Sequence, residues 1–334
     1  MLRRSKLFVL ALAMINGMEL VAQDPQLSQF YAAPLYLNPA LTGNIQQDRL
    51  ILNYRTQWVG LPNSYDTYAV SYDHRAALAN SGYGVMVMHD QAGTHGLSFT
   101  HVAANYSYEA RINNQQAFRA GLRMGYTMRS YDPSNFLFAD QIIRDNAANS
   151  VESNLLERTS YLDMSAGGLY FDEHFWVGVS MNHLNKPKQS LLVSGDARLP
   201  IRTSIHTGYR FPLKGKGNTK NGSKITIATH YKSQGKWDQF DIGAYLDHDR
   251  IIAGLWYRGL PGFKSYAPGY PNNDAVVFLV GFVANEQWQI VYSYDATISW
   301  LTPSSGGAHE ISLAYEWPRK SKRRKARIVP CPKF

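Results

Sequence analysis

Histidine and acidic residues are the side chains best suited to catalysis or metal binding in this chain, and their spacing matches no known motif of that kind. His89, His95 and His101 recur every six residues but straddle an expected turn, so we interpret them as strand and loop histidines. The Asp-His-Asp run at 247–249 could hold a cation, but Asp favours turns and we expect a tight turn there. GYG at 82–84 lacks the following helix of a phosphate loop. With no HExxH, GxSxG or calcium-loop pattern either, we predict no enzyme, metal or cofactor.

The chain instead consists of stretches in which apolar and polar residues alternate, bounded by turn residues, which is the pattern of β-strands. The last of these is clear, because Ile311, Leu313, Tyr315 and Trp317 share one face. A shift by one residue would turn that face to the other side, so the register is strongly specified. We expect 14 strands of roughly 10 residues each. They cover 49–57, 65–73, 83–89, 97–110, 117–130, 160–171, 175–182, 202–211, 224–231, 240–246, a stretch between 249 and 259, 276–282, 288–294 and 310–317.

Long and short connections alternate between these strands. Outer-membrane barrels have an even number of antiparallel strands, with short periplasmic turns and longer outer loops. The sequence therefore predicts an all-β fold, a single up-and-down transmembrane β-barrel of about 14 antiparallel strands. Two connections depart from the rhythm, a long one at 213–222 and a short one near 235. The expected long loops are 132–159, 183–200 and 259–273, and the expected short turns lie near 113, 172, 249 and 285.

A soluble, secreted β-sandwich or propeller is the competing fold, since alternation alone does not exclude it. The loop rhythm and the apolar face of nearly every late strand favour the membrane barrel. Composition agrees, because aromatic residues make up 13% of the chain, and outer-membrane barrels need aromatic girdles at both interfaces. A mean hydropathy of −0.32 fits as well, since half of each strand would face a polar lumen.

The first 22 residues resemble a secretory signal. Arg3, Arg4 and Lys6 precede an apolar stretch, and Ala22 provides a small residue at the cleavage site. Polar residues interrupt the apolar stretch, which leaves it too short for a membrane anchor. The expected division of the chain is a signal peptide at 1–22, a lead-in segment at 23–47, the barrel at 48–317 and a basic tail at 318–334.

The net charge of +9 comes from the two ends of the chain, because the expected barrel is close to neutral. An even number of strands would place both termini in the periplasm, which excludes a nucleic-acid partner for the tail. The tail is either a solvated stop beside the membrane or a dock for an acidic periplasmic partner, and Cys331 and Phe334 would belong to the same patch. Its basic residues are Arg319, Lys320, Lys322, Arg323, Arg324, Lys325 and Arg327, seven of nine positions.

Several motifs, in order along the whole chain, carry a family resemblance. The longest, QDPQLSQFYAAPLYLNPALTGN at 23–44, opens the expected mature chain. Each of the others is weak alone, but together they are specific. The chain resembles the PorP/SprF family of outer-membrane proteins of the Bacteroidetes type IX secretion system. The further motifs are YRTQW at 54–58, NHLNKP at 182–187, GLWYRG at 254–259, YSYD at 292–295, GGAHEISLAYEW at 306–317 and CPKF at 331–334.

The resemblance implies a barrel in outer-membrane lipid that assists the export, retention or surface delivery of proteins. The cargo would carry C-terminal sorting domains, and in gliding bacteria relatives serve large surface adhesins. The implied partners are the secretion machinery, including periplasmic ring components and the translocon. The competing function is an outer-membrane channel or small-ligand transporter.

Two motifs allow both a structural and a functional interpretation. The segment at 23–44 is either a structured lead-in to the first strand or a segment folded into the lumen or at its periplasmic mouth, where it contacts cargo or plugs the pore. NHLNKP is either a hydrogen-bonded strand end or part of a partner-binding rim, beside the outer loops and especially 132–159. The candidate partner-binding residues here are Gln29, Phe30, Tyr31, Asn38, Pro39, Gly43, Asn182, His183 and Asn185.

Overall fold

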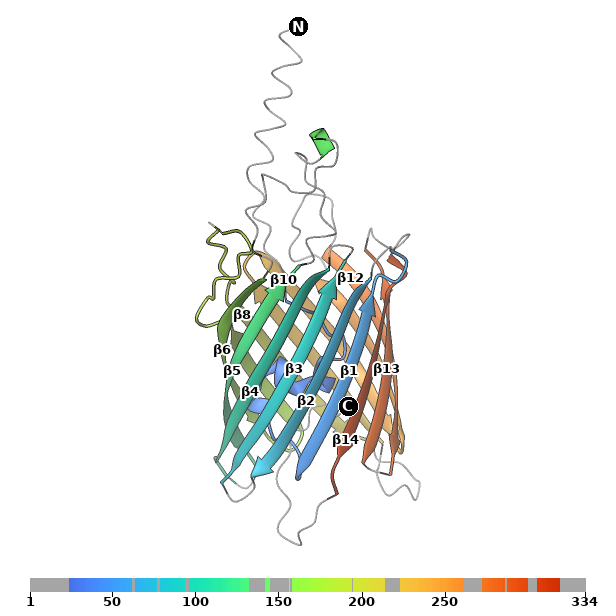
Figure 1. The fold of residues 1–334 in the computed structure, drawn as a ribbon. Coiled ribbons are helices and arrows are strands. Elements are labelled where there is room, and N and C mark those ends of the chain that lie inside the picture. Colours follow the sequence, from blue (N-terminus) through green and yellow to red (C-terminus); the bar gives the residue numbers. More distant parts are fainter. Residues whose placement is uncertain are drawn as a thin grey trace.

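The protein is a closed barrel of 14 antiparallel strands, seen from the side in Figure 1. The strands are β1 (Asp48–Gln57), β2 (Tyr65–Ala76), β3 (Ser81–Ala92), β4 (Leu97–Arg111), β5 (Ala117–Ser130), β6 (Arg158–Phe171), β7 (Phe175–Asn182), β8 (Arg202–Pro212), β9 (Lys224–Gln234), β10 (Trp237–His248), β11 (Ile251–Leu260), β12 (Asn272–Ala284), β13 (Trp288–Thr297) and β14 (Ala308–Glu316). This computed structural model describes residues 24–61, 64–76, 79–93, 96–113, 115–131, 142–144, 156, 158–193, 195–213, 223–260, 272–285, 287–299 and 305–318.

Every strand pairs with its neighbours in sequence, and β1 closes the barrel against β14, with Leu52 opposite Leu313. The predicted 14-strand barrel is thus confirmed. Within the described part of the chain, the exceptions to the loop rhythm are also present: the connection at 213–223 is long, whereas β9 and β10 are joined by only Gly235 and Lys236. The Asp-His-Asp run ends in the predicted tight turn, with Asp249 in the left-handed conformation.

Side chains alternate between the two faces of the barrel wall, as the period-2 pattern predicts. In β14, Ile311 is exposed on the outside, whereas Glu310 and Ser312 are buried inside. The outer face carries aliphatic side chains such as Val280 together with many tyrosines. The wall is therefore apolar toward lipid and polar toward the lumen, as in transmembrane barrels.

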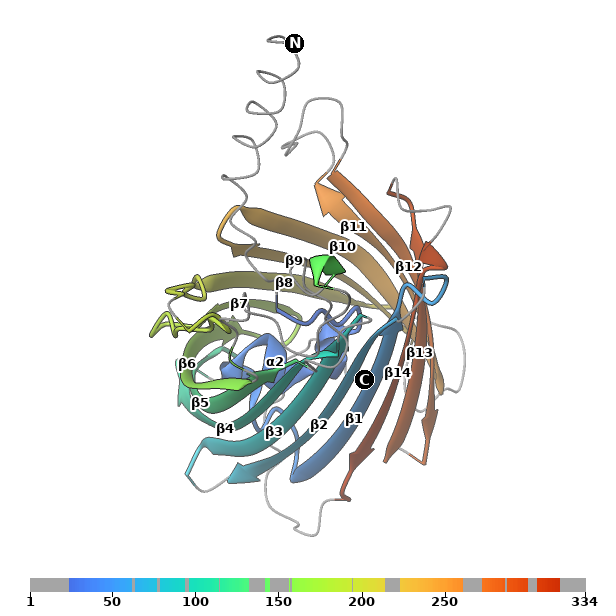
Figure 2. The same ribbon diagram turned by 45° about the horizontal axis from the view of Figure 1, so that its top comes forward.

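The segment before β1 fills the lumen, with its short helices inside the barrel in Figure 2. The helices are η1 (Phe30–Ala32), α2 (Pro34–Leu37) and η2 (Pro39–Leu41). The prolines at 34 and 39 each open a helix, where their missing N–H group is not needed. Among the described residues, no helix is long and apolar enough to cross a membrane.

The two ends of the barrel differ, and we name them by their connections. The short-turn mouth holds the start of β1 at Asp48 and the end of β14 at Glu316. The long-loop mouth holds Gln57, Asn182 and Gln234 at the strand ends. Residues 1–23 and 319–334, which include the expected signal peptide and all predicted tail residues, lie outside the described residues.

Both termini were expected on the same side of the membrane, but the two ends of the described chain lie at opposite mouths. The first described residue, Asp24, lies at the long-loop mouth beside Arg202 and Gln234, whereas Glu316 ends at the short-turn mouth. An even strand count fixes only where the first and last strands begin and end. The lead-in segment then runs through the lumen from one mouth to the other, which separates the two ends of the described chain.

Candidate functional site

Residues 24–45 form a plug that occupies the lumen. Gln29, Ala32, Asn38, Ala40 and Leu41 are fully buried there. Of the two interpretations of this segment, the lumenal position is therefore the observed one. Three layers of contacts hold the plug, two of them charged and one a close backbone contact, and aromatic contacts add to them.

The first layer is a charged clasp at the long-loop mouth. His183 Nε2 lies 2.7 Å from Asp24 Oδ2, and His183 Nδ1 lies 2.9 Å from Asp163 Oδ1. Arg202 Nη1 lies 2.8 Å from the same Asp24 oxygen and donates to the Tyr36 hydroxyl at 2.7 Å. Because His183 has a carboxylate at each ring nitrogen, the imidazolium form donates to both.

The ionisation of the clasp follows from these contacts. Burial alone would lower the pKa of His183, but Asp24 and Asp163 outweigh it and raise the pKa to about 9. Burial would raise the pKa of Asp24, but His183 and Arg202 hold it well below its usual range. Burial, partly offset by Arg202, raises the pKa of Tyr36 to about 12. At neutral pH the clasp therefore joins the cations His183 and Arg202 to the Asp24 carboxylate and the neutral Tyr36 phenol.

The NHLNKP motif supplies the wall side of this clasp. Besides His183, Asn182 Oδ1 accepts from Arg123, which in turn donates to the backbone oxygen of Leu35 at 3.1 Å. Asn185 contacts β6 instead, since its amide group forms hydrogen bonds with the backbone of Met164 and of Leu162. Two of the three predicted residues of this motif thus hold the plug, directly or through Arg123.

The second layer is a buried charge network at the level of Ser28. Asp295 Oδ2 lies 2.9 Å from both Arg55 Nη2 and Arg258 Nη1. Ser28 Oγ donates to Asp295 and accepts from both arginines. The backbone N–H groups of Ser28 and Gln29 donate to the Glu310 carboxylate at 2.6 and 3.1 Å. The plug thus supplies hydroxyl and N–H groups that bond to the charged side chains of the wall.

Aromatic contacts pack the plug against the barrel wall inside the lumen. The Phe30 ring packs edge-on against Trp256, with ring centroids 4.8 Å apart, and against His230 at 4.7 Å. Tyr31 packs against Trp176 at 5.9 Å and accepts a hydrogen bond from its indole N–H. These predicted residues lie in one buried apolar cluster that reaches the walls formed by β7 and β11.

The third layer is a close backbone contact toward the short-turn mouth. A Cβ on Gly121 would lie 2.2 Å from the Ala40 nitrogen and 2.3 Å from the Pro39 carbonyl carbon. Only glycine lets the two backbones approach this closely. The predicted residue Asn38 caps η2, and its amide group bonds to two backbone oxygens of the wall. Gly43 donates its N–H to Asp73 at 2.8 Å.

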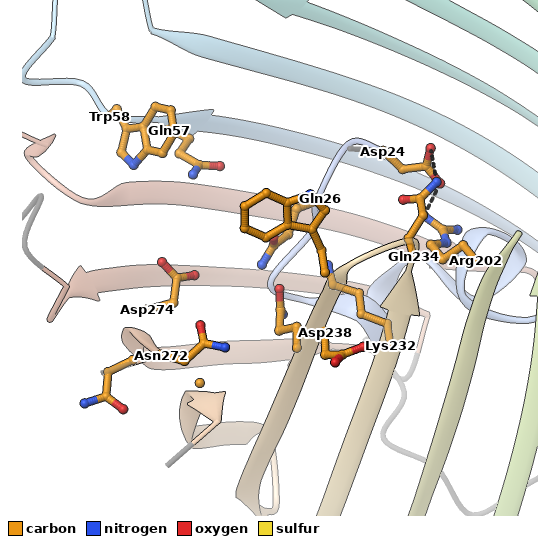
Figure 3. A pocket seen from close by; sticks show the side chains of 14 residues that line it. Asp24, Gln26, Gln57, Trp58, Arg202, Lys232, Gln234, Asp238, Asn272 and Asp274 are labelled. Carbon is orange, nitrogen blue, oxygen red and sulfur yellow. Dashed lines mark hydrogen bonds and ion pairs between the residues drawn. The ribbon is translucent and has the colours of Figure 1, made fainter. Parts of the chain in front are cut away.

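Above the plug, the long-loop mouth contains two adjoining cavities of roughly 290 and 480 Å³. They share Asp24, Gln26, Gln57 and Trp58, so we treat them as one vestibule with the start of the plug on its floor. Figure 3 shows the smaller cavity, with side chains of the plug, β1, β9, β10 and β12 facing one another.

The structure brings together the predicted residues of 29–43 with Asn182 and His183, and leaves their role in partner binding as a prediction. Sequence reasoning missed Arg55, Asp295 and Glu310. Their signal was present, since each is a charged residue at an inward position of a strand. Within the described residues, no group of three or more acidic, His or Cys side chains could hold a metal.

Several solved barrels share the general architecture at low similarity. The KdgM porin is 10% identical, over 81% of this chain and 99% of that chain, with a TM-score of 0.37. A deletion mutant of the TodX monoaromatic hydrocarbon channel is 11% identical, over 84% and 92%, with a TM-score of 0.47. CdiB from Acinetobacter baumannii is 10% identical, over 81% and 60%, with a TM-score of 0.44. These values carry no argument about function, and no curated protein matches the chain.

The family comparison is decisive, because the model of the type IX secretion system membrane protein PorP/SprF matches residues 20–315. The chain belongs to the PorP/SprF family. The match includes the whole plug and all 14 strands, apart from the last residue of β14. As a PorP/SprF protein, it is an outer-membrane β-barrel component of type IX secretion.

Proposed function

We propose that this PorP/SprF barrel receives exported proteins with C-terminal sorting domains and retains or delivers them at the cell surface, rather than conducting solutes. The observation that carries the proposal is the plug. Its residues are buried from Leu27 to Ile45, apart from Tyr36, which is partly exposed. A lumen filled in this way supports a role in handling proteins at the mouths of the barrel, rather than the alternative role of a channel or small-ligand transporter.

The nature of the contacts argues for a resident plug. Breaking a buried ion pair by removing one partner costs about 3–5 kcal/mol, because it leaves an uncompensated charge. Withdrawal of the plug would remove Asp24 from Arg202 and His183, and Ser28 from the Arg55 and Arg258 guanidinium groups. The plug is therefore part of the folded barrel in this account.

The orientation proposed here places the long-loop mouth outside the cell and the short-turn mouth in the periplasm, as in other outer-membrane barrels. The start of the plug and the vestibule then face the surface, where cargo arrives. In this orientation the described chain ends at the periplasmic side, because Trp317 N donates to Asp48 O at that mouth. We propose that the tail docks an acidic periplasmic ring component of the machinery.

The experiment that tests the proposal compares secreted and surface proteins of cells with and without this chain. The expected result is loss of a defined set of proteins that share a C-terminal sorting domain and accumulate inside the cell, with gliding adhesins among them in a gliding organism. An unchanged secretome together with altered solute uptake would overturn the proposal in favour of a channel.

The docking role of the tail has its own test. Deletion after Trp317 removes no residue of the 14 strands. The expected result is weaker association with the periplasmic machinery, most visibly at low salt, since salt screens exposed charges. Unchanged association at low salt would show that the tail is only a solvated stop.

A further inference from the structure

We infer that the vestibule at the long-loop mouth is a binding site for an extended polypeptide segment that ends in a free carboxylate. The inference deepens the proposed function, because it names the part of an exported protein that this barrel would hold. It rests on the hydrogen-bonding groups of the vestibule, on the conformation of Trp58 and on the closure of the barrel.

Hydrogen-bond donors without partners line three separate walls of the vestibule. Among the described residues, Arg129 Nε on β5 and Asn272 Nδ2 on β12 are buried and have no hydrogen-bond partner. Lys232 on β9 also lines the vestibule, and among the described residues it forms no ion pair or side-chain hydrogen bond, although Asp241 and Asp24 attract it from a distance. Buried polar groups are nearly always paired in folded proteins, so these donors point to a missing acceptor.

The acceptors of the vestibule are, by contrast, engaged. Asp24 is held by the clasp, Asp90 accepts from Thr67 at 2.5 Å, Asp238 accepts from the Tyr231 hydroxyl at 3.1 Å, and the half-exposed Asp274 lies 3.6 Å from Arg258. A ligand that fits must therefore supply acceptors more than donors. Peptide carbonyl groups and a terminal carboxylate do so, whereas sugar hydroxyl groups donate as readily as they accept.

The shape of the site requires an extended ligand. The unpaired donors belong to β5, β9 and β12, which lie on different sides of the closed barrel. A ligand that meets the donors of all three strands must therefore extend across the mouth. Each strand pairs with two neighbours, although β7 covers β6 only from Ala166 to Phe171, and the recognition inferred here rests on the side-chain donors.

Trp58 gives the site an aromatic surface. Its backbone has φ of +61°, a left-handed conformation that is strained for a bulky residue. Two hydrogen bonds hold this turn: the Trp58 N–H donates to Gly307 O, and the Trp58 carbonyl oxygen accepts from Leu61 N. The result is an indole that borders both cavities and packs edge-on to Tyr65. Strain of this kind is often found at ligand sites.

We assign the roles by charge. Lys232 binds the terminal carboxylate, while Arg129 and Asn272 donate to backbone carbonyl groups farther along the peptide. Trp58 and Trp237 flank the chain of the ligand with their indole rings. The plug residues Asp24 and Gln26 form the floor, so the peptide stops above the plug and does not thread the barrel.

The test uses a photo-cross-linking amino acid, p-benzoylphenylalanine, in place of Trp58 in the full chain in living cells. The expected adduct contains the last residues of an exported protein, identified by mass spectrometry. The same substitution at Trp237 is the second site, in case the turn at 58 does not tolerate the change. Tyr54 is the control, because it lies on β1, the strand that leads to Trp58, but faces outward. A saccharide or lipid adduct, or only internal peptides, would overturn the inference.

A binding measurement then tests the carboxylate. The decapeptide of the terminal adduct, with a free or an amidated C-terminus, is titrated against the purified barrel. Amidation is expected to weaken binding roughly tenfold, the effect of losing a hydrogen bond to a charged group. Lys232→Met should abolish that difference, and Lys224→Met at the other end of β9 should leave it unchanged. Equal binding of acid and amide would contradict the inference, while the secretome comparison would still decide the proposed function.

Discussion

His183 of the wall and Asp24 of the plug lie 2.7 Å apart, and this contact ties the first described residue of the chain to the mouth of its own barrel. The same imidazole contacts Asp163, so the clasp depends on its protonation. The contact also gives the NHLNKP motif a structural task. It connects a motif near the middle of the sequence to one near its start.

The clasp should weaken at high pH. The folded pKa of His183 lies at about 9, above its ordinary value of 6.5, so its contribution to stability is complete below pH 6.5 and is lost as the pH rises through 9. A bimane fluorophore on Gln26→Cys, in a Cys331→Ser background, reports release of the plug end through reduced quenching by vestibule tryptophans. We expect a transition near pH 9.

The variant His183→Gln should lack this transition and show reduced quenching at every pH. His174→Gln is the matched control, because His174 lies at the opposite mouth, and it should behave like the parent. If His183→Gln retains the transition near pH 9, another group controls the plug end.

Gly121→Ala should displace the plug. The added methyl group would lie 2.2 Å from the Ala40 nitrogen, and backbone on both sides leaves it no room. We expect a loss of about 1–3 kcal/mol, the usual cost of overpacking. The denaturation midpoint of the purified barrel and the rate of proteolysis within residues 24–45 measure it. Gly168→Ala is the control, since its methyl group would meet only the Phe118 ring at 3.3 Å. Equal stability of the two variants would refute the close contact.

Asp295→Asn should destabilise the plugged barrel strongly. It leaves the Arg55 and Arg258 guanidinium groups without their shared carboxylate, at an expected cost of about 3–5 kcal/mol in unfolding free energy. The control is Asp247→Asn, whose pair with Lys224 is exposed and 4.0 Å long, and whose loss should cost less than about 1 kcal/mol. Denaturant unfolding in detergent compares the two, and a smaller effect at Asp295 would speak against the buried network.

Cell-surface labelling tests the orientation. The chain has one cysteine, Cys331, in the tail that we place in the periplasm. A membrane-impermeant maleimide should not label it in intact cells, but should do so once the outer membrane is permeabilised. Val193→Cys in a Cys331→Ser background lies in an exposed position of the long-loop mouth and should react in intact cells. The reverse pattern would invert the proposed orientation.

The strands could be predicted from sequence because their signal is local. In β12, Val276, Phe278, Val280 and Phe282 alternate with inward residues, and lipid outside and a polar lumen inside enforce that period. Strand ends were less certain, so β9 and β10 each extend a few residues beyond the prediction. Turn residues indicate where a chain can bend, but they do not fix the residue at which a strand ends.

The plug could be predicted only as one of two alternatives, because its contacts are long-range and its sequence has no period. Nothing near Ser28 indicates that Asp295 lies beside it, 267 positions later. A glycine within a strand, such as Gly121, indicates either a bend or a close backbone approach, and the structure shows a close approach. Charged residues at inward strand positions, such as Arg55 and Glu310, were the unused signal for a filled lumen.

Conductance of the purified barrel in planar lipid bilayers tests most directly whether the plug closes the lumen. The full chain should show no stable open level, whereas a variant lacking residues 24–41 should show steady conductance steps if its barrel still forms. Heat-dependent migration on a gel confirms that each sample is a folded barrel. A stable open level in the full chain, as large as that of the variant without the plug, would contradict a closed lumen and return the protein to the class of channels.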